Sequence, residues 1–265
     1  MIHYSIDDIR KEFIELYLSE AFVTSGDTKT IEIIDANFEI KPGETAIFGS
    51  LNEYANRELQ WYLSESLSVD DIPGECPKIW KQCATKDDAH EINSNYGFLE
   101  FNESNYSQYK HALNELIKDP NSRRACHIYT RPSIWYEYNR DGMSDYICTF
   151  ATQQFLRKFD SKSNKYTLIY CVSMRSNDAI TGLKNDLYWA RYIAGRMIYD
   201  LKAAGIEVED EPIIYWHANS LHLYERSFGL LENYIRDHGT KEMKKRLDSI
   251  QSERFFNNSL NNSKF

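Results

Sequence analysis

The amino-acid sequence predicts an α/β fold, of the α+β kind, in one large domain. Apolar residues recur at helical spacing in several segments, and short runs rich in β-branched and aromatic residues lie between them. Of the 265 residues, 42% are hydrophobic and 14% aromatic, enough for one sizeable core. We therefore expect a single domain over residues 1–250 and a flexible, Asn- and Ser-rich tail over 251–265.

Charge and cysteine content argue against several classes of protein. The net charge of −9 gives no support for binding nucleic acid, because such binding depends on neutralising phosphates. Neither a membrane-spanning run nor a secretory N-terminus is evident, so we expect no membrane binding and no export. The five cysteines match neither a disulfide framework nor a zinc site, which indicates a reducing compartment such as the cytoplasm and no bound metal.

The first half of the chain predicts helices separated by loops. Ser5-Ile-Asp-Asp8 has the form of a capping box before an amphipathic helix. The polar loop Thr24–Thr30 precedes a β-rich run; such loops can wrap phosphate, but a simple turn is favoured. Residues 105–118, capped by Ser104, predict another helix. Between these, residues 52–67 predict a helix with an apolar face made of Leu59, Trp61, Tyr62 and Leu63.

Strands and one long helix are expected in the second half. A short strand at 125–130 is followed by a longer one at 143–155, which contains Cys148. A polar turn at 160–165 joins that strand to the next. Residues 188–204 predict a long amphipathic helix, and the following glycine ends it.

Cys148 is the candidate nucleophile, although a lone cysteine in a strand is more often buried packing. Arg175, soon after the next strand, can lower the pKa of a thiol, hold a phosphate, or both. In so acidic a chain an anionic substrate needs a local basic cluster, which draws attention to Arg175 and to the pair Arg123 and Arg124.

The spacing of these residues resembles the core of the thymidylate synthase superfamily. Cys148 is followed five positions on by Gln153, and then by the loop Arg175-Ser-Asn-Asp178. Within the superfamily the chain looks most like the phage-type deoxycytidylate hydroxymethylases, and the resemblance covers roughly residues 31–228. It implies a thymidylate synthase-like fold with a large mixed β-sheet flanked by helices. It also implies a homodimer packed through one sheet face, working in phage nucleotide metabolism in the host cytoplasm.

The resemblance also implies roles for individual residues. Glu58, in a Glu-Leu-Gln-Trp-Tyr helix, would order the water that handles protons, and Lys29 would close over the nucleotide phosphate. Arg123 and Arg124 would bind the phosphate of the nucleotide held by the other subunit. Tyr96 would line the pocket. The remaining substrate contacts would come from Gln153, Arg175, Ser176, Asn185, His222 and Tyr224, and Asp178 would contact the pterin of the folate.

Asp186 is the residue expected to set base preference. Uracil presents an N3–H donor and an O4 acceptor, which an amide matches, whereas cytosine presents an N3 acceptor and an N4 amino donor. Asp186 stands where the synthases carry asparagine, and its carboxyl can accept from the amino group while a shared proton bridges it to N3. Protonating N3 also makes carbon-6 more electrophilic. Cytosine is therefore the expected base.

The implied reaction is hydroxymethyl transfer from 5,10-methylenetetrahydrofolate to carbon-5 of dCMP, giving 5-hydroxymethyl-dCMP. Cys148 would add to carbon-6, and water would then add to an exocyclic methylene on the ring. Ile147 and Thr149 replace a proline and a histidine of the synthases, which points away from thymidylate synthesis. Three alternatives stay open: a CMP hydroxymethylase, a dUMP-directed synthase variant and a non-catalytic nucleotide-binding regulator.

Overall fold

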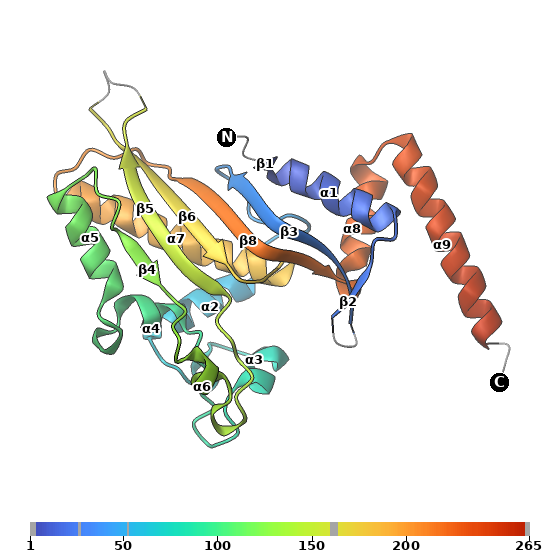
Figure 1. Cartoon of the computed structure of the whole chain (residues 1–265), viewed down its shortest axis with the longest axis horizontal. Helices are drawn as coiled ribbons and strands as arrows, with labels where there is room; N and C mark the ends of the chain where they lie inside the picture. The colour runs from blue at the N-terminus through green and yellow to red at the C-terminus, as the bar shows by residue number, and fades with distance from the viewer. Residues whose placement is uncertain (1–3, 26–27, 52, 160–163, 263–265) are drawn as a thin grey trace.

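A mixed sheet forms the centre of the computed structural model, which describes residues 4–25, 28–51, 53–159 and 164–262 (Figure 1). The side chains of Ser25 and of residues 254–262 are not described. The main strand order is β1-β3-β8-β6-β5-β4, with β2 beside β3 and β7 beside β8. The strands are β1 (Tyr4–Ser5), β2 (Val23–Ser25), β3 (Thr28–Ile40), β4 (Cys126–Ile128), β5 (Thr149–Arg157), β6 (Thr167–Met174), β7 (Asn177–Asp178) and β8 (Ile213–Tyr224).

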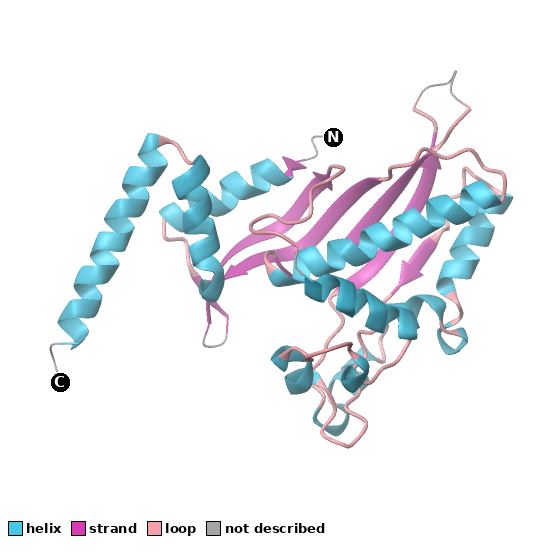
Figure 2. Ribbon diagram, turned by 180° about the vertical axis from the view of Figure 1, so that it is seen from behind, coloured by secondary structure: helices cyan, strands magenta, loops and turns pink. Residues whose placement is uncertain are grey.

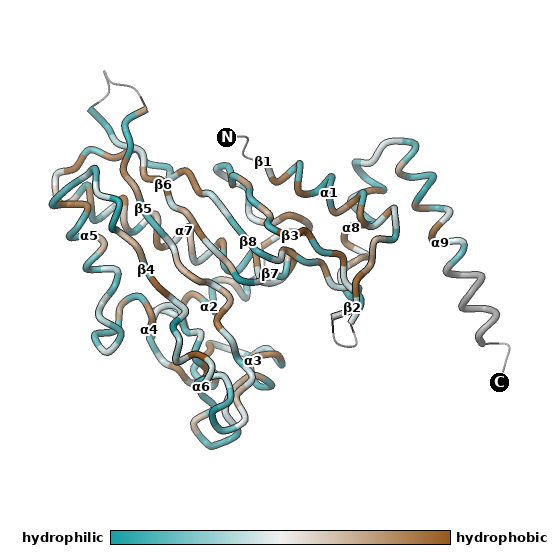
Figure 3. The backbone as a smooth tube through the Cα atoms, viewed as in Figure 1, coloured by the Kyte–Doolittle hydropathy of each residue, from teal (hydrophilic) through white to brown (hydrophobic). Residues whose placement is uncertain are grey.

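Strand pairing in this sheet is of both kinds. β3 runs antiparallel to β8, and β5 antiparallel to β6, whereas β6 and β8 are parallel. Apolar and polar residues alternate along the strands, as the changes of colour along β3 show (Figure 3). Such alternation gives each strand two different faces. The predicted α/β class, with a mixed sheet flanked by helices, is confirmed.

Helices cover one face of the sheet and its ends. α7 crosses the face seen in Figure 2, where Trp216 of β8 and Trp189 of α7 are buried. The opposite face of β5, β6 and β8 is not covered by any helix in the described part of the chain (Figure 1). The helices are α1 (Ile6–Leu18), α2 (Glu53–Ser64), α3 (Lys78–Cys83), α4 (Tyr96–Phe101), α5 (Gln108–Lys118), α6 (Ile134–Tyr138), α7 (Thr181–Ala203), α8 (Phe228–His238) and α9 (Lys241–Asn262).

Local sequence signals place several helix ends correctly and others wrongly. The capping box before α1 is present, since Ser5 and Asp8 bond each other's backbone N–H. α5 begins at Gln108 rather than 105, because Tyr106 and Ser107 adopt positive φ values of 67° and 44°. α7 begins seven residues before the predicted 188, at Thr181, so Asn185 and Asp186 lie inside the helix.

Other boundaries also differ from the prediction. The expected loop at Thr24–Thr30 is mostly a hairpin of β2 and β3, and its residues 26–27 lie outside the described residues. So do Asn52 and most of the predicted 160–165 turn. Cys148 stands directly before β5, not within it. The predicted tail starts inside α9, whose backbone stays helical to Asn262; flexibility there stays a prediction.

Candidate active site

Cys148 is held in place by the loop after β6. Its carbonyl oxygen accepts a hydrogen bond from the Arg175 backbone N–H at 2.6 Å, and its Sγ accepts one from Arg175 Nη2 at 3.4 Å. The guanidinium also lies over the Tyr146 ring, 4.6 Å from its centroid. Burial raises the pKa of the Cys148 thiol to about 11, and Arg175 opposes this rise. The expected lowering by Arg175 is therefore outweighed, and the resting thiol keeps its proton at neutral pH.

Glu58 is a buried carboxyl at the centre of α2. Only 4% of the residue is exposed, and its Oε1 accepts a hydrogen bond from the Tyr54 hydroxyl at 2.8 Å. Burial raises its pKa to about 8, and the negative charge of Asp186 adds to the rise. A carboxyl with a pKa near neutrality can both give and take a proton, as a general acid or base must. The predicted apolar face of α2 needs one correction, because Leu63 is exposed while Glu58 is buried.

Asp186 is a second carboxyl with a raised pKa, half-buried on α7. Its Oδ2 accepts a hydrogen bond from Asn177 Nδ2 at 2.8 Å. Burial raises the pKa of Asp186 to about 7, and the charge of Asp178 raises it further, while hydrogen bonds from Asn177 and Tyr96 lower it. Asp186 is thus poised between its charged and neutral forms at physiological pH.

Tyr96 joins these groups into one site. Its ring stacks on Tyr62, with centroids 5.2 Å apart, and its hydroxyl accepts a hydrogen bond from Thr149 Oγ1 at 3.0 Å. Burial raises the pKa of Tyr96, and the charges of Asp186 and Cys148 add to that effect. Tyr96 therefore lies close to both. The structure brings together residues from α2, α4, the position before β5, the segment after β6 and α7. We call them the Cys148 cluster: Cys148, Glu58, Tyr96, Arg175, Asn177 and Asp186.

Asp178, His222 and Tyr224 form the edge of this cluster. Asp178 of β7 pairs with His222 of β8, whose ring lies edge-on to Tyr224 with centroids 4.8 Å apart. Asp178 Oδ1 accepts from the backbone N–H of Ile180 at 2.9 Å, at the start of α7, and its Oδ2 pairs with Arg226 at 2.9 Å. Burial is the main cause that raises the pKa of Tyr224, and the negative charges of Asp178 and Cys148 add to the rise. Tyr224, a predicted substrate contact, thus lies near the thiol, and His222, another predicted contact, lies beside Tyr224.

Four predicted contacts lie outside the Cys148 cluster of their own chain. Lys29 pairs with Glu225, next to Tyr224, at 3.9 Å. Arg123 and Arg124 are exposed at the turn before β4. Gln153 lies on the sheet face opposite α7 and donates a hydrogen bond to the Arg123 carbonyl oxygen at 2.8 Å.

Two further predicted residues belong to the site's wall. Asn185 is buried on α7, and its Oδ1 makes no hydrogen bond among the described residues. Ser176 is half-buried between Arg175 and Asn177. Unpaired buried acceptors such as Asn185 Oδ1 and Asn177 Oδ1 are uncommon in folded proteins and fit a ligand that brings donors.

Sequence reasoning missed three residues of the site. Asn177 lies inside the Arg175-Ser-Asn-Asp178 loop, and its position in that motif was enough to predict it as a site residue. Tyr54, one helical turn before Glu58, was recognisable from its spacing alone. Asp145 gave no signal: it is buried three residues before Cys148 and accepts from the Asn93 backbone N–H at 3.0 Å. Burial raises the pKa of Asp145 to about 6, and its charge helps to raise that of Cys148.

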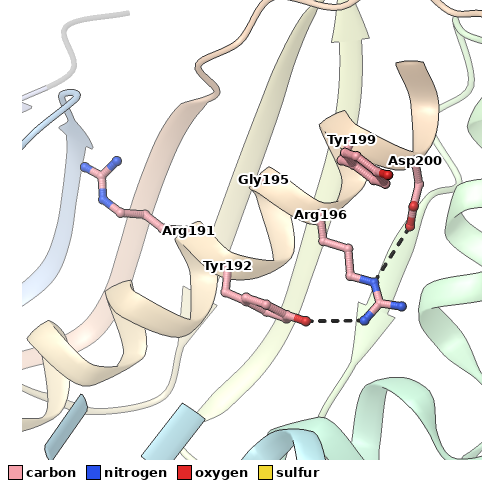
Figure 4. Close-up of a pocket in the computed structure, with 6 residues that line it drawn as sticks. All are labelled: Arg191, Tyr192, Gly195, Arg196, Tyr199 and Asp200. Atoms are coloured by element: carbon pink, nitrogen blue, oxygen red, sulfur yellow. Dashed lines mark hydrogen bonds and ion pairs between the residues drawn. The ribbon is translucent and has the colours of Figure 1, made fainter. Parts of the chain in front are cut away.

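A surface hollow on the outer side of α7 is a different feature (Figure 4). There Arg196 donates to the Tyr192 hydroxyl at 3.3 Å and pairs with Asp200 at 3.8 Å. The hollow contains no nucleophile and none of the Cys148 cluster. It is lined by Arg191, Tyr192, Gly195, Arg196, Tyr199 and Asp200.

The described residues contain no group of three or more His, Cys, Asp or Glu side chains placed to hold a metal ion. No helix among them is long and apolar enough to span a membrane.

Residues 44–264 match the family model for thymidylate synthase, and the chain belongs to that family. Over 247 residues it is 44% identical to the deoxycytidylate 5-hydroxymethyltransferases of Enterobacteria phages T6 and T4, with 90% of this chain and 96% of each relative aligned. It is 28% identical over 199 residues to a thymidylate synthase of Fusobacterium nucleatum, an alignment that covers 74% of this chain and 65% of that protein.

A solved structure confirms the predicted fold. The chain matches the thermostable thymidylate synthase A from Bacillus subtilis with a TM-score of 0.60 and 21% sequence identity, over 86% of this chain and 81% of that chain. Members of the thymidylate synthase family use methylenetetrahydrofolate as a co-substrate.

Proposed function

We propose that the protein transfers a hydroxymethyl group from 5,10-methylenetetrahydrofolate to carbon-5 of dCMP. Its 44% identity to phage deoxycytidylate 5-hydroxymethyltransferases, over 90% of its length, supports this function. The observation that carries the choice of base is the carboxyl of Asp186, held by Asn177 beside Cys148.

The surroundings of Asp186 suit cytosine better than uracil. A carboxyl whose pKa is about 7 can keep a proton to share with cytosine N3 while its other oxygen accepts from the N4 amino group. The unpaired amide oxygens of Asn177 on β7 and Asn185 on α7 are further acceptors. Uracil would place its O4 acceptor against these acceptors, and a buried mismatch of this kind costs about 1–3 kcal/mol.

The chemistry follows from the residues around the ring. Cys148 loses its proton and adds to carbon-6, which makes carbon-5 nucleophilic. Arg175 stabilises the thiolate at 3.4 Å while that bond forms. Carbon-5 attacks the methylene carbon of the folate and loses its proton to water, and tetrahydrofolate then leaves with the electrons of the C–N bond that breaks. Water adds to the exocyclic methylene that remains, and the sulfur leaves carbon-6. Glu58, with a pKa of about 8, is the group suited to orient that water and take its proton.

The acceptor oxygens of Asp178 fit the donors of the folate. The folate supplies the one-carbon unit, and its pterin ring presents a 2-amino group beside an N3–H, two donors side by side. Asp178 Oδ2 is paired with the Arg226 guanidinium, which presents donors in a similar planar arrangement. Tyr96 supplies an aromatic wall nearby, between Tyr62 and the Cys148 cluster.

Phosphate binding implies a second subunit. Arg175 contacts Cys148 on its own chain, whereas Arg123 and Arg124 are exposed at the turn before β4, where Arg124 Nη1 lies 3.4 Å from Glu115 Oε1. The uncovered face of β5, β6 and β8 is half-buried and carries Gln153. In the proposed homodimer two such faces meet, and each subunit places its two arginines on the other's nucleotide. Lys29 closes over the phosphate, and His222 and Tyr224 bind the sugar hydroxyl.

Product analysis tests this function directly. The purified protein is incubated with dCMP and methylenetetrahydrofolate, with dUMP and CMP in parallel, and the nucleotides are identified by mass spectrometry. Hydroxymethylated dCMP that disappears in Cys148→Ser supports both the reaction and the nucleophile. Methylated dUMP without a product from dCMP would mean that the protein is a thymidylate synthase. Preference for CMP over dCMP would overturn the deoxyribonucleotide assignment.

A further inference from the structure

A small internal cavity lies behind Asp186, between the sheet and α7. Three neighbouring strands line it with Thr152 of β5, Tyr170 of β6 and Trp216 of β8. On the side of α7 it is lined by Asp186 and, one helical turn further on, by Trp189 and Ala190. The cavity has room for about one water molecule.

Strand register places the three sheet residues on one face. Thr152 pairs with Val172, and Val172 pairs in turn with Trp216. Tyr170 lies two residues before Val172, and side chains two residues apart on a strand point to the same side. All three face α7.

Each of these three residues has a polar atom without a partner. Thr152 Oγ1, Tyr170 Oη and Trp216 Nε1 make no hydrogen bond among the described residues, although the residues are 3%, 0% and 1% exposed. The Thr152 and Tyr129 hydroxyls are near enough to lower the pKa of Tyr170, which burial raises, but neither meets its hydroxyl in hydrogen-bond geometry. An unpaired buried polar group costs about 1–3 kcal/mol, so three around one cavity call for a common partner.

The wall of the cavity opposite Asp186 is also polar. Tyr129 lines it, accepts from Trp189 Nε1 at 3.1 Å and donates to the Glu100 carboxyl. Glu100 Oε1 lies 2.7 Å from His127 Nδ1, and both side chains are fully buried. The reaction proposed above uses none of these groups. The cavity therefore has the Asp186 carboxyl on one side and the hydrogen-bonded Tyr129, Glu100 and His127 on the other.

We propose that this cavity holds an ordered water molecule that bridges Thr152, Tyr170 and Trp216 to Asp186. A water molecule can make four hydrogen bonds, and four groups face the cavity. The water accepts from Trp216 Nε1 and donates to the Asp186 carboxyl. The hydroxyls of Thr152 and Tyr170 supply the other two bonds. Asn177 holds Asp186 from the other side at 2.8 Å. The carboxyl that faces the base is then fixed between an amide and a buried water, and Thr152 and Tyr170 are positioning residues.

The water itself is tested by crystallography, independently of the reaction. A structure of the full chain at better than about 2 Å resolution is expected to show one water within hydrogen-bond distance of Thr152 Oγ1, Tyr170 Oη and Trp216 Nε1. In Thr152→Val, which keeps the side-chain shape, that density is expected to weaken or vanish. A dry cavity in the unmodified protein overturns the proposal.

Kinetics test what the water does, and this part rests on the proposed function. Thr152→Val and Tyr170→Phe are each expected to lower kcat/KM for dCMP ~10-fold and to reduce the preference for dCMP over dUMP. The double variant is expected to lose little more, because both remove one shared water. Thr167→Val, a matched change at the start of β6 away from the cavity, controls for strand effects.

The outcomes separate the two proposals. Additive losses with unchanged base preference mean a merely structural role and overturn the positioning role. If the unmodified protein turns over no nucleotide while the water is present, the proposed function fails and the water site stands. Melting temperatures of all variants are measured, since a fall in stability does not by itself change base preference.

Discussion

Asn177 Nδ2 donates a hydrogen bond to Asp186 Oδ2 at 2.8 Å, which ties the loop after β6 to the second turn of α7. This contact orients the carboxyl, and both of its oxygens keep a lone pair for a ligand. Asn177 is itself 3% exposed, and its own Oδ1 has no partner among the described residues. The pair therefore presents acceptors to a base, as an amino-pyrimidine requires.

Replacing Asp186 by asparagine is expected to reverse base preference. An amide at position 186 can donate to O4 of uracil and accept from its N3–H, but it cannot share a proton with cytosine N3. We expect Asp186→Asn to lose at least ~10-fold in kcat/KM for dCMP and to gain activity on dUMP. The ratio of the two kcat/KM values is the measurement, with Asp186→Glu as the control that keeps the carboxyl. An unchanged ratio contradicts the assignment.

Stability is expected to fall as pH rises, because of Glu58. Its pKa is raised from 4.5 to about 8, so between these values the folded chain keeps a proton that the unfolded chain has lost. The folded state then binds more protons, and the free energy of unfolding decreases with rising pH across that window. Asp186 and Asp145, with pKa values raised to about 7 and about 6, act in the same direction.

Urea unfolding at pH 5, 6.5 and 8 measures this effect. Glu58→Gln removes the titrating group, and it is expected to flatten the pH dependence by ~3 kcal/mol between pH 5 and pH 8. Glu12→Gln, at an exposed position of α1, is the matched control and should leave the dependence unchanged. A Glu58→Gln protein with the same slope as the unmodified one shows that Glu58 is already ionised in the folded state.

Mixed dimers test the shared phosphate site. A Cys148→Ser subunit keeps its arginines, and a subunit carrying Arg123→Ala and Arg124→Ala keeps its thiol. Neither homodimer is expected to be active, but a mixture that exchanges subunits restores one complete site per heterodimer, up to ~25% of full activity for random pairing. Lys110→Ala, at an exposed position of α5, serves as a charge control. No recovery after verified exchange shows that the arginines act within their own chain.

The sequence located most of the Cys148 cluster but not its electrostatics. Cys148, Glu58 and Asp186 were found because each stands in a motif of fixed spacing, and the structure gathers them. The raised pKa of the thiol is not predicted by the motifs, because it comes first from burial and then from the charges of Asp186 and Asp145, and Asp145 belongs to no motif. Electrostatic effects of this kind depend on tertiary contacts that no local pattern records.

Helix and strand limits show the same division. The capping box depends only on the four adjacent residues Ser5 to Asp8, so the sequence predicts it correctly. The start of α7 was missed because Gly182 and Lys184 interrupt its apolar pattern, while Asp178, outside the helix, accepts from its first N–H groups. Arg123 and Arg124 lie outside the Cys148 cluster of their own chain, because the nucleotide they are proposed to bind belongs to the other subunit.

The ion pair between Arg226 and Asp178 yields a last prediction. Arg226 Nη2 lies 2.9 Å from Asp178 Oδ2, and the guanidinium lies over the Tyr224 ring, 4.1 Å from its centroid. If the pterin donates to the same oxygen, it must displace the arginine. Arg226 is open to solvent although Asp178 is largely covered, and a solvent-screened ion pair contributes about 0.2–1 kcal/mol, so Arg226→Met is expected to lower KM for methylenetetrahydrofolate by ~2- to 5-fold. KM for dCMP and kcat should stay within twofold, and Arg226→Lys, which keeps the charge, should change KM less. A rise in KM for the folate in Arg226→Met means instead that the arginine binds the folate itself.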